Sequence, residues 1–226
     1  MPRHQSRGPA ARRRSASAGP SDPPEAVQPP RIIGGELKGK RLPFTPDGRT
    51  RPMKDRVREV LFDLVGPAVK NALAIDLFAG SGALGFEAVS RGAAAAVLAE
   101  RHFPTADQLK KTAVDLGIAG CVDVRPGDAL LWAKRMPPLD ASRPWVVFFS
   151  PPWAMFHERT ADLMALIELF RQSAPAGSRL VVEADDTFAA ASLPAAEQWT
   201  CRPLSPAILY LLSTGAANAA ELVAGS

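Results

Sequence analysis

The stretch VVFFSPPW, residues 146–153, ends an apolar run with a hydroxyl group, two prolines and a large aromatic ring. Two prolines end a β-strand, because proline lacks a backbone N–H and fixes φ. The Ser150 hydroxyl and the Pro151 carbonyl can both accept hydrogen bonds, and the ring of Trp153 can stack on a base for about 1–3 kcal/mol. Two acceptors that hold the hydrogens of one amino group would free its lone pair. The stretch therefore predicts a binding site for a planar amine. The alternative is a strand end beside a packed tryptophan.

A second candidate is DLFAGSGALG, residues 76–85, in which an apolar strand runs into a glycine-rich turn. Glycines let the backbone approach a ligand closely, and the helix that follows presents an electropositive N-terminus. Gly80, Gly82 and Gly85 match the spacing of a dinucleotide-binding loop, so a dinucleotide remains an alternative to any other adenosine-containing ligand.

Two carboxylates follow later strands of the same kind. Glu100 lies 24 residues after Asp76, at a position suited to accept hydrogen bonds from ribose hydroxyls. Asp128, in the sequence Gly-Asp-Ala, could accept a bond from an adenine amino group. A solvated rim charge is the alternative for Glu100, and a helix cap is the alternative for Asp128.

The elements that must position these residues alternate along the chain. Apolar runs predict strands, and the segments between them predict helices, one of them opened by Pro104 and closed by Gly117. This alternation predicts an α/β fold with a doubly wound, mostly parallel sheet. Its carboxyl strand ends form one crevice, where the candidate residues meet. The expected strands are 73–78, 94–100, 121–125, 145–149, 179–184, 197–202 and 207–213, and later helices are expected at 129–134 and 160–170.

A small basic extension precedes this core. Residues 31–44 predict a hairpin that turns at Gly34-Gly35. A helix is expected from Lys54 or Asp55 to Gly66-Pro67, because apolar residues recur at helical spacing. Its apolar positions are Val57, Val60, Leu61 and Leu64, and Arg56 and Arg58 are expected on its polar side.

Positive charge is concentrated in the first quarter of the chain. Residues 1–30 hold five Arg and two acidic residues, and residues 31–58 hold nine Lys or Arg and three acidic residues. Residues 59–226 have a net charge of −5. Such asymmetry favours a polyanionic partner, with nucleic acid first, over a merely solvated surface. Residues 1–30 also hold seven Pro and predict a disordered basic tail; an organelle transit peptide is the alternative.

Length and composition bound the remaining possibilities. The 226 residues, 46% of them hydrophobic, are enough for one substantial core. The sequence has no apolar run of transmembrane length and no hydrophobic signal segment at its start. Cys121 and Cys201 are the only cysteines, and the three His are scattered, which gives no disulfide framework and no metal-ligand spacing. We expect a soluble cytoplasmic protein, a monomer, without a metal or a membrane.

Three blocks in this order resemble one family. DLFAGSGALGFEAVSRG followed by LAE resembles the S-adenosylmethionine site of Rossmann-like methyltransferases, and SPPW resembles the signature of their amino-methylating branch. RIIGGELKGKRL and RPMKDRVREVLFDLV are similar to the start of the bacterial 16S rRNA guanine 2-amino methyltransferase (RsmD) family. The resemblance covers roughly residues 31–213. It implies a methyltransferase domain over 31–213, with an RNA-binding extension (31–66) and a catalytic core (67–213), followed by a tail (214–226).

The resemblance implies a role for each matched residue. The cofactor would be S-adenosylmethionine, bound by Asp76, Phe78, Gly80, Ser81, Gly82, Glu100, Asp128 and Ala129. The target guanine, turned out of its stack, would be held by Ser150, Pro151, Pro152 and Trp153. Small-subunit rRNA, free or in an assembling subunit, would be bound by Arg31, Lys38, Lys40, Arg41, Arg51, Pro52, Asp55 and Arg56.

Three positions depart from the family pattern. Position 150 is Ser where the family has Asp or Asn, and a hydroxyl is a weaker acceptor than a carboxylate. Position 53 is Met where the family has Thr, and the usual glycine before the last strand is missing. The alternatives to guanine methylation are therefore methylation of another amine such as adenine in DNA, a catalytically silent RNA-binding protein, and a dinucleotide-dependent oxidoreductase.

Overall fold

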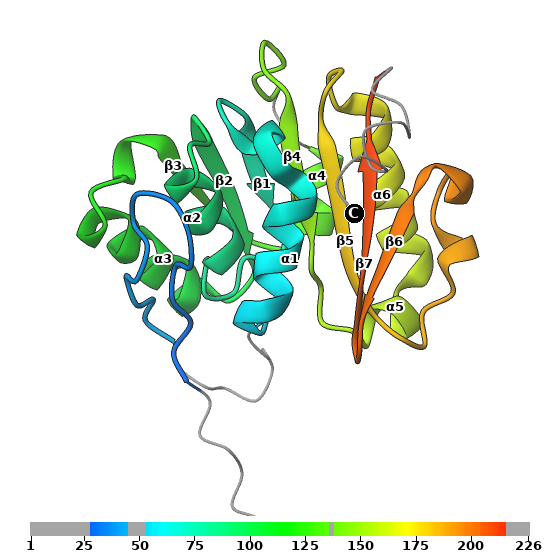
Figure 1. The fold of residues 1–226 in the computed structure, drawn as a ribbon, viewed down its shortest axis with the longest axis horizontal. Coiled ribbons are helices and arrows are strands. Elements are labelled where there is room, and N and C mark those ends of the chain that lie inside the picture. Colours follow the sequence, from blue (N-terminus) through cyan, green and yellow to red (C-terminus); the bar gives the residue numbers. More distant parts are fainter. Residues whose placement is uncertain (1–27, 45–52, 136–137, 216–226) are drawn as a thin grey trace, which may run out of the picture.

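The computed structural model describes residues 28–44, 53–135 and 138–215, and within them a seven-stranded sheet forms the centre of the molecule (Figure 1). The strand order is β3-β2-β1-β4-β5-β7-β6. Strands β1 to β5 are parallel to one another, whereas β7 is antiparallel to both β5 and β6. The chain reverses its winding direction between β1 and β4, and this confirms the predicted doubly wound, mostly parallel α/β fold. The strands are β1 (Leu73–Asp76), β2 (Ala95–Glu100), β3 (Val122–Pro126), β4 (Trp145–Phe149), β5 (Arg179–Asp185), β6 (Thr200–Leu204) and β7 (Ala207–Ser213).

Helices cover both faces of the sheet. Each face has its own buried apolar cluster, one with α1 to α3 and the other with α4 to α6. Strands β1 and β4 are buried along their whole length, as expected for central strands covered on both sides. The helices are α1 (Asp55–Val65), α2 (Ala83–Ser90), α3 (Phe103–Asp115), α4 (Ala129–Lys134), α5 (Met155–Glu158) and α6 (Thr160–Ser173), and short 3-10 turns lie at Gly66–Val69, Ala119–Cys121, Ala190–Ser192 and Ala196–Gln198.

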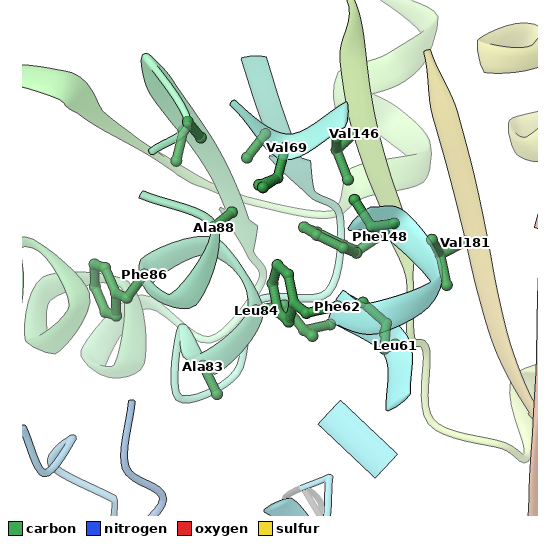
Figure 2. Close-up of a cluster of buried hydrophobic side chains, with 14 of the residues drawn as sticks. Leu61, Phe62, Val69, Ala83, Leu84, Phe86, Ala88, Val146, Phe148 and Val181 are labelled. Atoms are coloured by element: carbon green, nitrogen blue, oxygen red, sulfur yellow. The ribbon is translucent and has the colours of Figure 1, made fainter. Parts of the chain in front are cut away.

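Helix α1 belongs to the amino-terminal extension and packs on the sheet rather than projecting from it. Figure 2 shows Leu61 and Phe62 of α1 against Phe148 of β4 and Val181 of β5. The rings of Phe62 and Phe148 are 5.7 Å apart between centroids. Full burial of such side chains contributes about 1.5–3 kcal/mol each. The extension and the core are therefore one packed unit, and α1 has a fixed place over β4 and β5.

The prediction that Arg58 lies on the polar side of its helix was wrong. Its side chain has no exposed surface. The guanidinium donates to the Arg31 carbonyl (2.5 Å) and to Asp55 Oδ1 (2.8 Å), and its Nε lies 3.8 Å from Glu87 Oε2 of α2. A buried cation persists only when it is paired, and apolar periodicity alone does not reveal such pairing. Arg56 is exposed, as predicted.

The prediction that the hairpin of residues 31–44 turns at Gly34-Gly35 was also wrong. Residues 31 and 41 form a single antiparallel bridge, and the chain reverses over 34–39. The two glycines instead lie against the end of α2: a Cβ on Gly35 would be 1.8 Å from the Ser90 carbonyl oxygen. The Ser90 hydroxyl donates to the Gly34 carbonyl (2.6 Å), and the Glu87 carboxylate accepts from the Ile33 N–H (2.7 Å). The close approach of two backbones therefore explains this glycine pair.

The remaining element boundaries differ little from expectation. The fourth strand and the helix at 129–134 match, and β1 ends two residues early because the glycine-rich turn begins there. Strand β6 starts at Thr200 rather than 197, since residues 196–198 form a 3-10 turn and the Trp199 indole donates to the Pro194 carbonyl (2.8 Å). The expected tails at 1–30 and 214–226 lie almost wholly outside the described residues.

Candidate active site

A cavity of about 560 Å³ opens at the carboxyl ends of β1, β2, β4 and β5. Its walls come from the loops that follow the parallel strands, from the beginning of α1 and from the turn between β6 and β7. Residues of the predicted cofactor site and of the SPPW segment both line this cavity. The predicted residues that line it are Phe78, Gly80, Glu100, Asp128, Ala129, Ser150, Pro151, Pro152 and Trp153.

Other predicted site residues do not line this cavity. They divide into three residues of the glycine-rich segment and a group of polar residues in the amino-terminal extension. The first group is Asp76, Ser81 and Gly82, and the second is Arg31, Lys38, Lys40, Arg41, Asp55 and Arg56. Arg51 and Pro52 lie outside the described residues.

Glu100 joins the first two strand ends. Its Oε2 accepts from the Gly80 N–H (2.8 Å), and its Oε1 accepts from the His102 N–H (2.7 Å). Gly80 has a positive φ of 51°, which lets the turn bend back toward β2. Each carboxylate oxygen keeps a further lone pair, so Glu100 can still accept bonds from two hydroxyl groups in the cavity.

Asp76 stands behind this turn. It is 1% exposed, and its Oδ2 accepts from the N–H of Gly85 in the first turn of α2 (3.2 Å). Burial raises the pKa of Asp76 to about 7. No described residue forms a hydrogen bond to its Oδ1. Direct contact between Asp76 and a cofactor stays a prediction, and the contact observed is with the start of α2.

Gly82 is required by packing. Its φ is 77°, and a Cβ there would lie 2.4 Å from the Phe86 ring and 2.7 Å from a Leu109 methyl group. The glycine therefore lets α2 start close to α3. Of the three glycines Gly80, Gly82 and Gly85, only Gly80 borders the cavity. Gly82 is needed instead for the packing of α2 against α3.

Asp128 caps the helix that follows it, which was the alternative considered for this residue, and its contact with an adenine amino group stays a prediction. Its Oδ1 accepts from the Leu130 N–H (2.8 Å) and caps α4, while its Oδ2 lies 3.5 Å from Nη1 of Arg159. Both Asp128 and Arg159 border the cavity. Helix α4 and the loop before α6 are therefore tied together at the rim by one carboxylate.

The segment after β4 closes the inner side of the cavity. Pro151 is buried and Trp153 is half-buried, packed against the apolar clusters of both faces. The Pro152 and Trp153 carbonyls accept from the first residues of α5. No described residue donates to the Pro151 carbonyl, which is consistent with the prediction that it serves as a free acceptor.

The sequence interpretation missed a carboxylate beside Ser150. The Ser150 hydroxyl donates to Glu183 Oε2 of β5, and Glu183 lines the cavity although it is only 8% exposed. Burial raises the pKa of Glu183, and the hydrogen bond from Ser150 opposes this only in part. The signal was present in RLVVEA, where one acid interrupts an otherwise apolar run.

Other cavity residues come from segments that are remote in sequence. Met53 and Lys54 stand at the beginning of α1, and residues 204–207 form the turn between β6 and β7. Only the packing of α1 on the sheet and the antiparallel β5–β7 pairing bring them to the strand ends. Met53, one of the three departures from the family pattern, is thus part of the wall.

The described residues contain no cluster of three or more His, Cys, Asp or Glu placed to hold a metal ion. None of the helices that the structure describes is long and apolar enough to cross a membrane.

The chain is similar in sequence and in structure to known methyltransferases. Ribosomal RNA small subunit methyltransferase D of Escherichia coli (strain K12) is 39% identical over 123 residues, which are 54% of this chain and 60% of the relative. The protein of the same name from Haemophilus influenzae is 36% identical over 143 residues, 62% of this chain and 70% of the relative. The chain thus spans about 60% of the length of the first of these relatives.

A solved structure extends the similarity over more of the fold. The putative methyltransferase yhhF from Escherichia coli superposes with a TM-score of 0.67 at 31% sequence identity. The superposition covers 84% of this chain and 99% of the yhhF chain. The model of the family Conserved hypothetical protein 95 matches residues 30–197. The chain therefore belongs to this family, that of the ribosomal RNA small subunit methyltransferases D, as its three sequence blocks predicted.

Proposed function

We propose that this protein transfers the methyl group of S-adenosylmethionine to the exocyclic 2-amino group of a guanine in small-subunit rRNA. The observation that carries the proposal is the single cavity that brings the glycine turn, Glu100 and Asp128 together with the SPPW segment. Relatives at 36–39% identity are named as methyltransferases of small-subunit rRNA, which supports the choice of reaction and RNA.

The residues on one side of the cavity suit an adenosine-containing cofactor. Glu100 has free lone pairs for two ribose hydroxyls, and the positive φ of Gly80 lets the backbone approach a ligand. Asp128 offers a carboxylate oxygen for an amino group, beside the small side chain of Ala129. When bound, S-adenosylmethionine supplies an electrophilic methyl group on a sulfonium centre.

The other side of the cavity suits the target base. The half-buried ring of Trp153 offers a face for stacking, and the Ser150 oxygen and Pro151 carbonyl offer acceptors for the two hydrogens of one amino group. Holding those hydrogens directs the nitrogen lone pair at the methyl carbon. A C–N bond then forms as the C–S bond breaks, and one amine proton is released to solvent. The contribution of the protein is positioning and electrostatic stabilisation.

RNA would be held by the basic extension. Arg31, Lys38, Lys40 and Arg41 are all exposed, as is Arg56 on α1. Exposed cations can neutralise phosphates without reading the sequence.

We also propose that the protein acts in the cytoplasm, as a monomer, on an assembling subunit. The methyltransferase domain would span residues 31–213.

The test is a comparison of substrates. The full chain is incubated with methyl-labelled S-adenosylmethionine and undermethylated small subunits, large subunits or DNA, and cofactor binding is measured by calorimetry. The proposal predicts label in small-subunit RNA alone. Label in DNA would favour the adenine alternative, and cofactor binding without label in any polymer would favour a silent RNA-binding protein.

A further inference from the structure

The carboxylate of Glu183 is an unusual group for the place it occupies. It lies on β5 between Val182 and Ala184, which are both fully buried, and it is 8% exposed. Nevertheless it borders the cavity. A buried carboxylate costs stability unless it is paired, and among the described residues its only hydrogen-bond partner is Ser150. Nothing in the packing of the sheet requires an acid at this position.

The sheet register explains how these two residues meet. Phe148 pairs with Val181 and Phe149 with Val182, so Ser150 lies beside Glu183 on the face that α1 covers. The neighbour of Glu183 on the other side is Leu209 of β7. The strands next to β5 therefore bring only the Ser150 hydroxyl to this carboxylate, at the wall of the cavity.

The direction of the hydrogen bond determines what Ser150 presents to a ligand. A hydroxyl group has one proton and two lone pairs. Because its proton is donated to Glu183, the Ser150 oxygen can act toward the cavity only as an acceptor. Donation to an anion also polarises the O–H bond and strengthens the oxygen as an acceptor.

We propose that Glu183 is a positioning residue for the target amine: it holds the Ser150 proton so that the Ser150 oxygen accepts a hydrogen bond from the amine, and its negative charge stabilises the positive charge that develops on the attacking nitrogen. The inference rests on the proposed function and deepens it. Its substrate is a neutral amino group on a planar base, the class of group that becomes cationic as the methyl group is transferred.

The pH dependence of the reaction follows from the pair. Burial raises the pKa of Glu183, so the ionised form is lost at a higher pH than for an ordinary glutamate. The wild-type rate should fall as the pH drops through this raised pKa. Other charged or titratable groups also face the cavity, so the informative quantity is the ratio of the wild-type rate to that of an E183Q variant. These groups are Lys54 at the start of α1, Glu100, Arg101 and His102 after β2, Asp128 after β3, and Glu158 and Arg159 at the end of α5.

The experiment measures single-turnover methyl transfer at saturating S-adenosylmethionine and undermethylated small subunits, from pH 5.5 to 8.5. We expect E183Q to lower the rate by about 100-fold at pH 8, the lower end of the loss for one positioned electrostatic contact, with cofactor affinity within twofold of wild type. The ratio of wild-type to E183Q rates should shrink toward acid pH. E183Q should slow S150A by a smaller factor than it slows wild type, because the part of the Glu183 role that orients the hydroxyl acts only through Ser150.

A rescue variant separates this role from a structural one. S150D/E183Q places an anionic acceptor at position 150 itself. Its methyl-transfer rate should be at least tenfold higher than that of E183Q. E197Q, which neutralises an exposed acid in the 3-10 turn before β6, is the matched control and should keep the wild-type rate.

Two outcomes would overturn the inference while leaving the proposed function intact: an E183Q rate within twofold of wild type at pH 8, or no recovery of the rate in S150D/E183Q. Absence of methyl transfer by the wild-type protein would overturn the proposed function, and the inference with it.

Discussion

At the residue scale, the site consists of acceptors held by hydrogen bonds that the fold itself supplies. Glu100 is fixed by two backbone N–H groups, Asp128 by the first turn of α4, and Ser150 by Glu183. Each side chain is therefore oriented before any ligand arrives. Such pre-organisation lowers the reorganisation that transfer chemistry requires.

Trp153 provides the simplest test of the base side. Replacing it with Leu keeps an apolar side chain but removes the stacking face, which contributes about 1–3 kcal/mol. We expect W153L to raise the KM for small-subunit RNA by about 5–150-fold. The dissociation constant of S-adenosylmethionine, measured by calorimetry, should stay within threefold. An equal loss of cofactor affinity would show that Trp153 holds the fold of the cavity rather than a base.

The raised pKa of Asp76 predicts that the free energy of unfolding depends on pH. Its pKa is about 7 in the folded protein against an ordinary value of 3.8. The neutral form is thus favoured by folding, so the contribution to stability is complete below about pH 4 and is lost as the pH rises toward 7. A D76N variant cannot ionise. Its free energy of unfolding relative to wild type should rise between pH 4 and 8, by up to about 4 kcal/mol.

Urea denaturation at a series of pH values measures this difference. D115N, which neutralises an exposed acid at the end of α3, is the control. A difference between D76N and wild type that is constant with pH would contradict a buried, proton-binding Asp76.

At the scale of elements, the amino-terminal segment is attached to the core through one buried cation. Arg58 of α1 contacts the Arg31 carbonyl, Asp55 and Glu87, and Glu87 in turn binds the Ile33 N–H and Arg91. This network joins three segments that are distant in sequence. It sets where the basic residues 31–41 lie relative to α1 and α2.

Removing one partner of this network should be more harmful than removing both. In R58M the buried Glu87 loses a cation, and a broken buried pair costs about 3–5 kcal/mol of unfolding free energy. In R58M the buried carboxylate of Glu87 keeps only Arg91 as a cationic partner. R58M/E87Q removes this buried charge and keeps an acceptor for the Ile33 N–H, so it should be more stable than R58M alone. The measurement is urea denaturation, with the exposed R56M as control. If R58M falls within 1 kcal/mol of wild type, the network does not stabilise the fold.

At the scale of the whole molecule, the cavity and the exposed cations belong to one rigid unit. The amino-terminal segment lies against the end of α2, and Figure 1 shows it on the side of the sheet away from β6. The exposed cations of the described segment 31–41 therefore lie toward one edge of the sheet, whereas residues 59–226 have a net charge of −5.

RNA binding should follow this distribution of charge. A K38A/K40A/R41A variant should weaken RNA binding and lower the slope of log K against log salt concentration by about 2–3, since each phosphate contact contributes about 0.7–0.9. Binding of S-adenosylmethionine should not change. R143A/R171A/R202A removes the same charge elsewhere, and a matching fall in its salt slope would contradict a localised RNA surface.

The sequence was sufficient for those parts of the fold that depend on local patterns. Apolar runs, glycines and prolines located the strands and most helices, because chain direction and burial are encoded in neighbouring residues. Glu183, Met53 and the turn at 204–207 were missed as cavity residues, since only strand register and helix packing bring them there. Arg58 was misplaced for a related reason: two of its three partners, Arg31 and Glu87, lie 27 and 29 residues away.

The central claim is methyl transfer to the 2-amino group of guanine, and the most direct measurement is the identity of the product nucleoside. Undermethylated small subunits are incubated with the wild-type protein and S-adenosylmethionine, and the RNA is digested and analysed by mass spectrometry against nucleoside standards. The account predicts one new nucleoside, 2-amino-methylated guanosine, with its yield sharply reduced by E183Q. A methylated adenosine, or no methylated nucleoside despite measured cofactor binding, would contradict it.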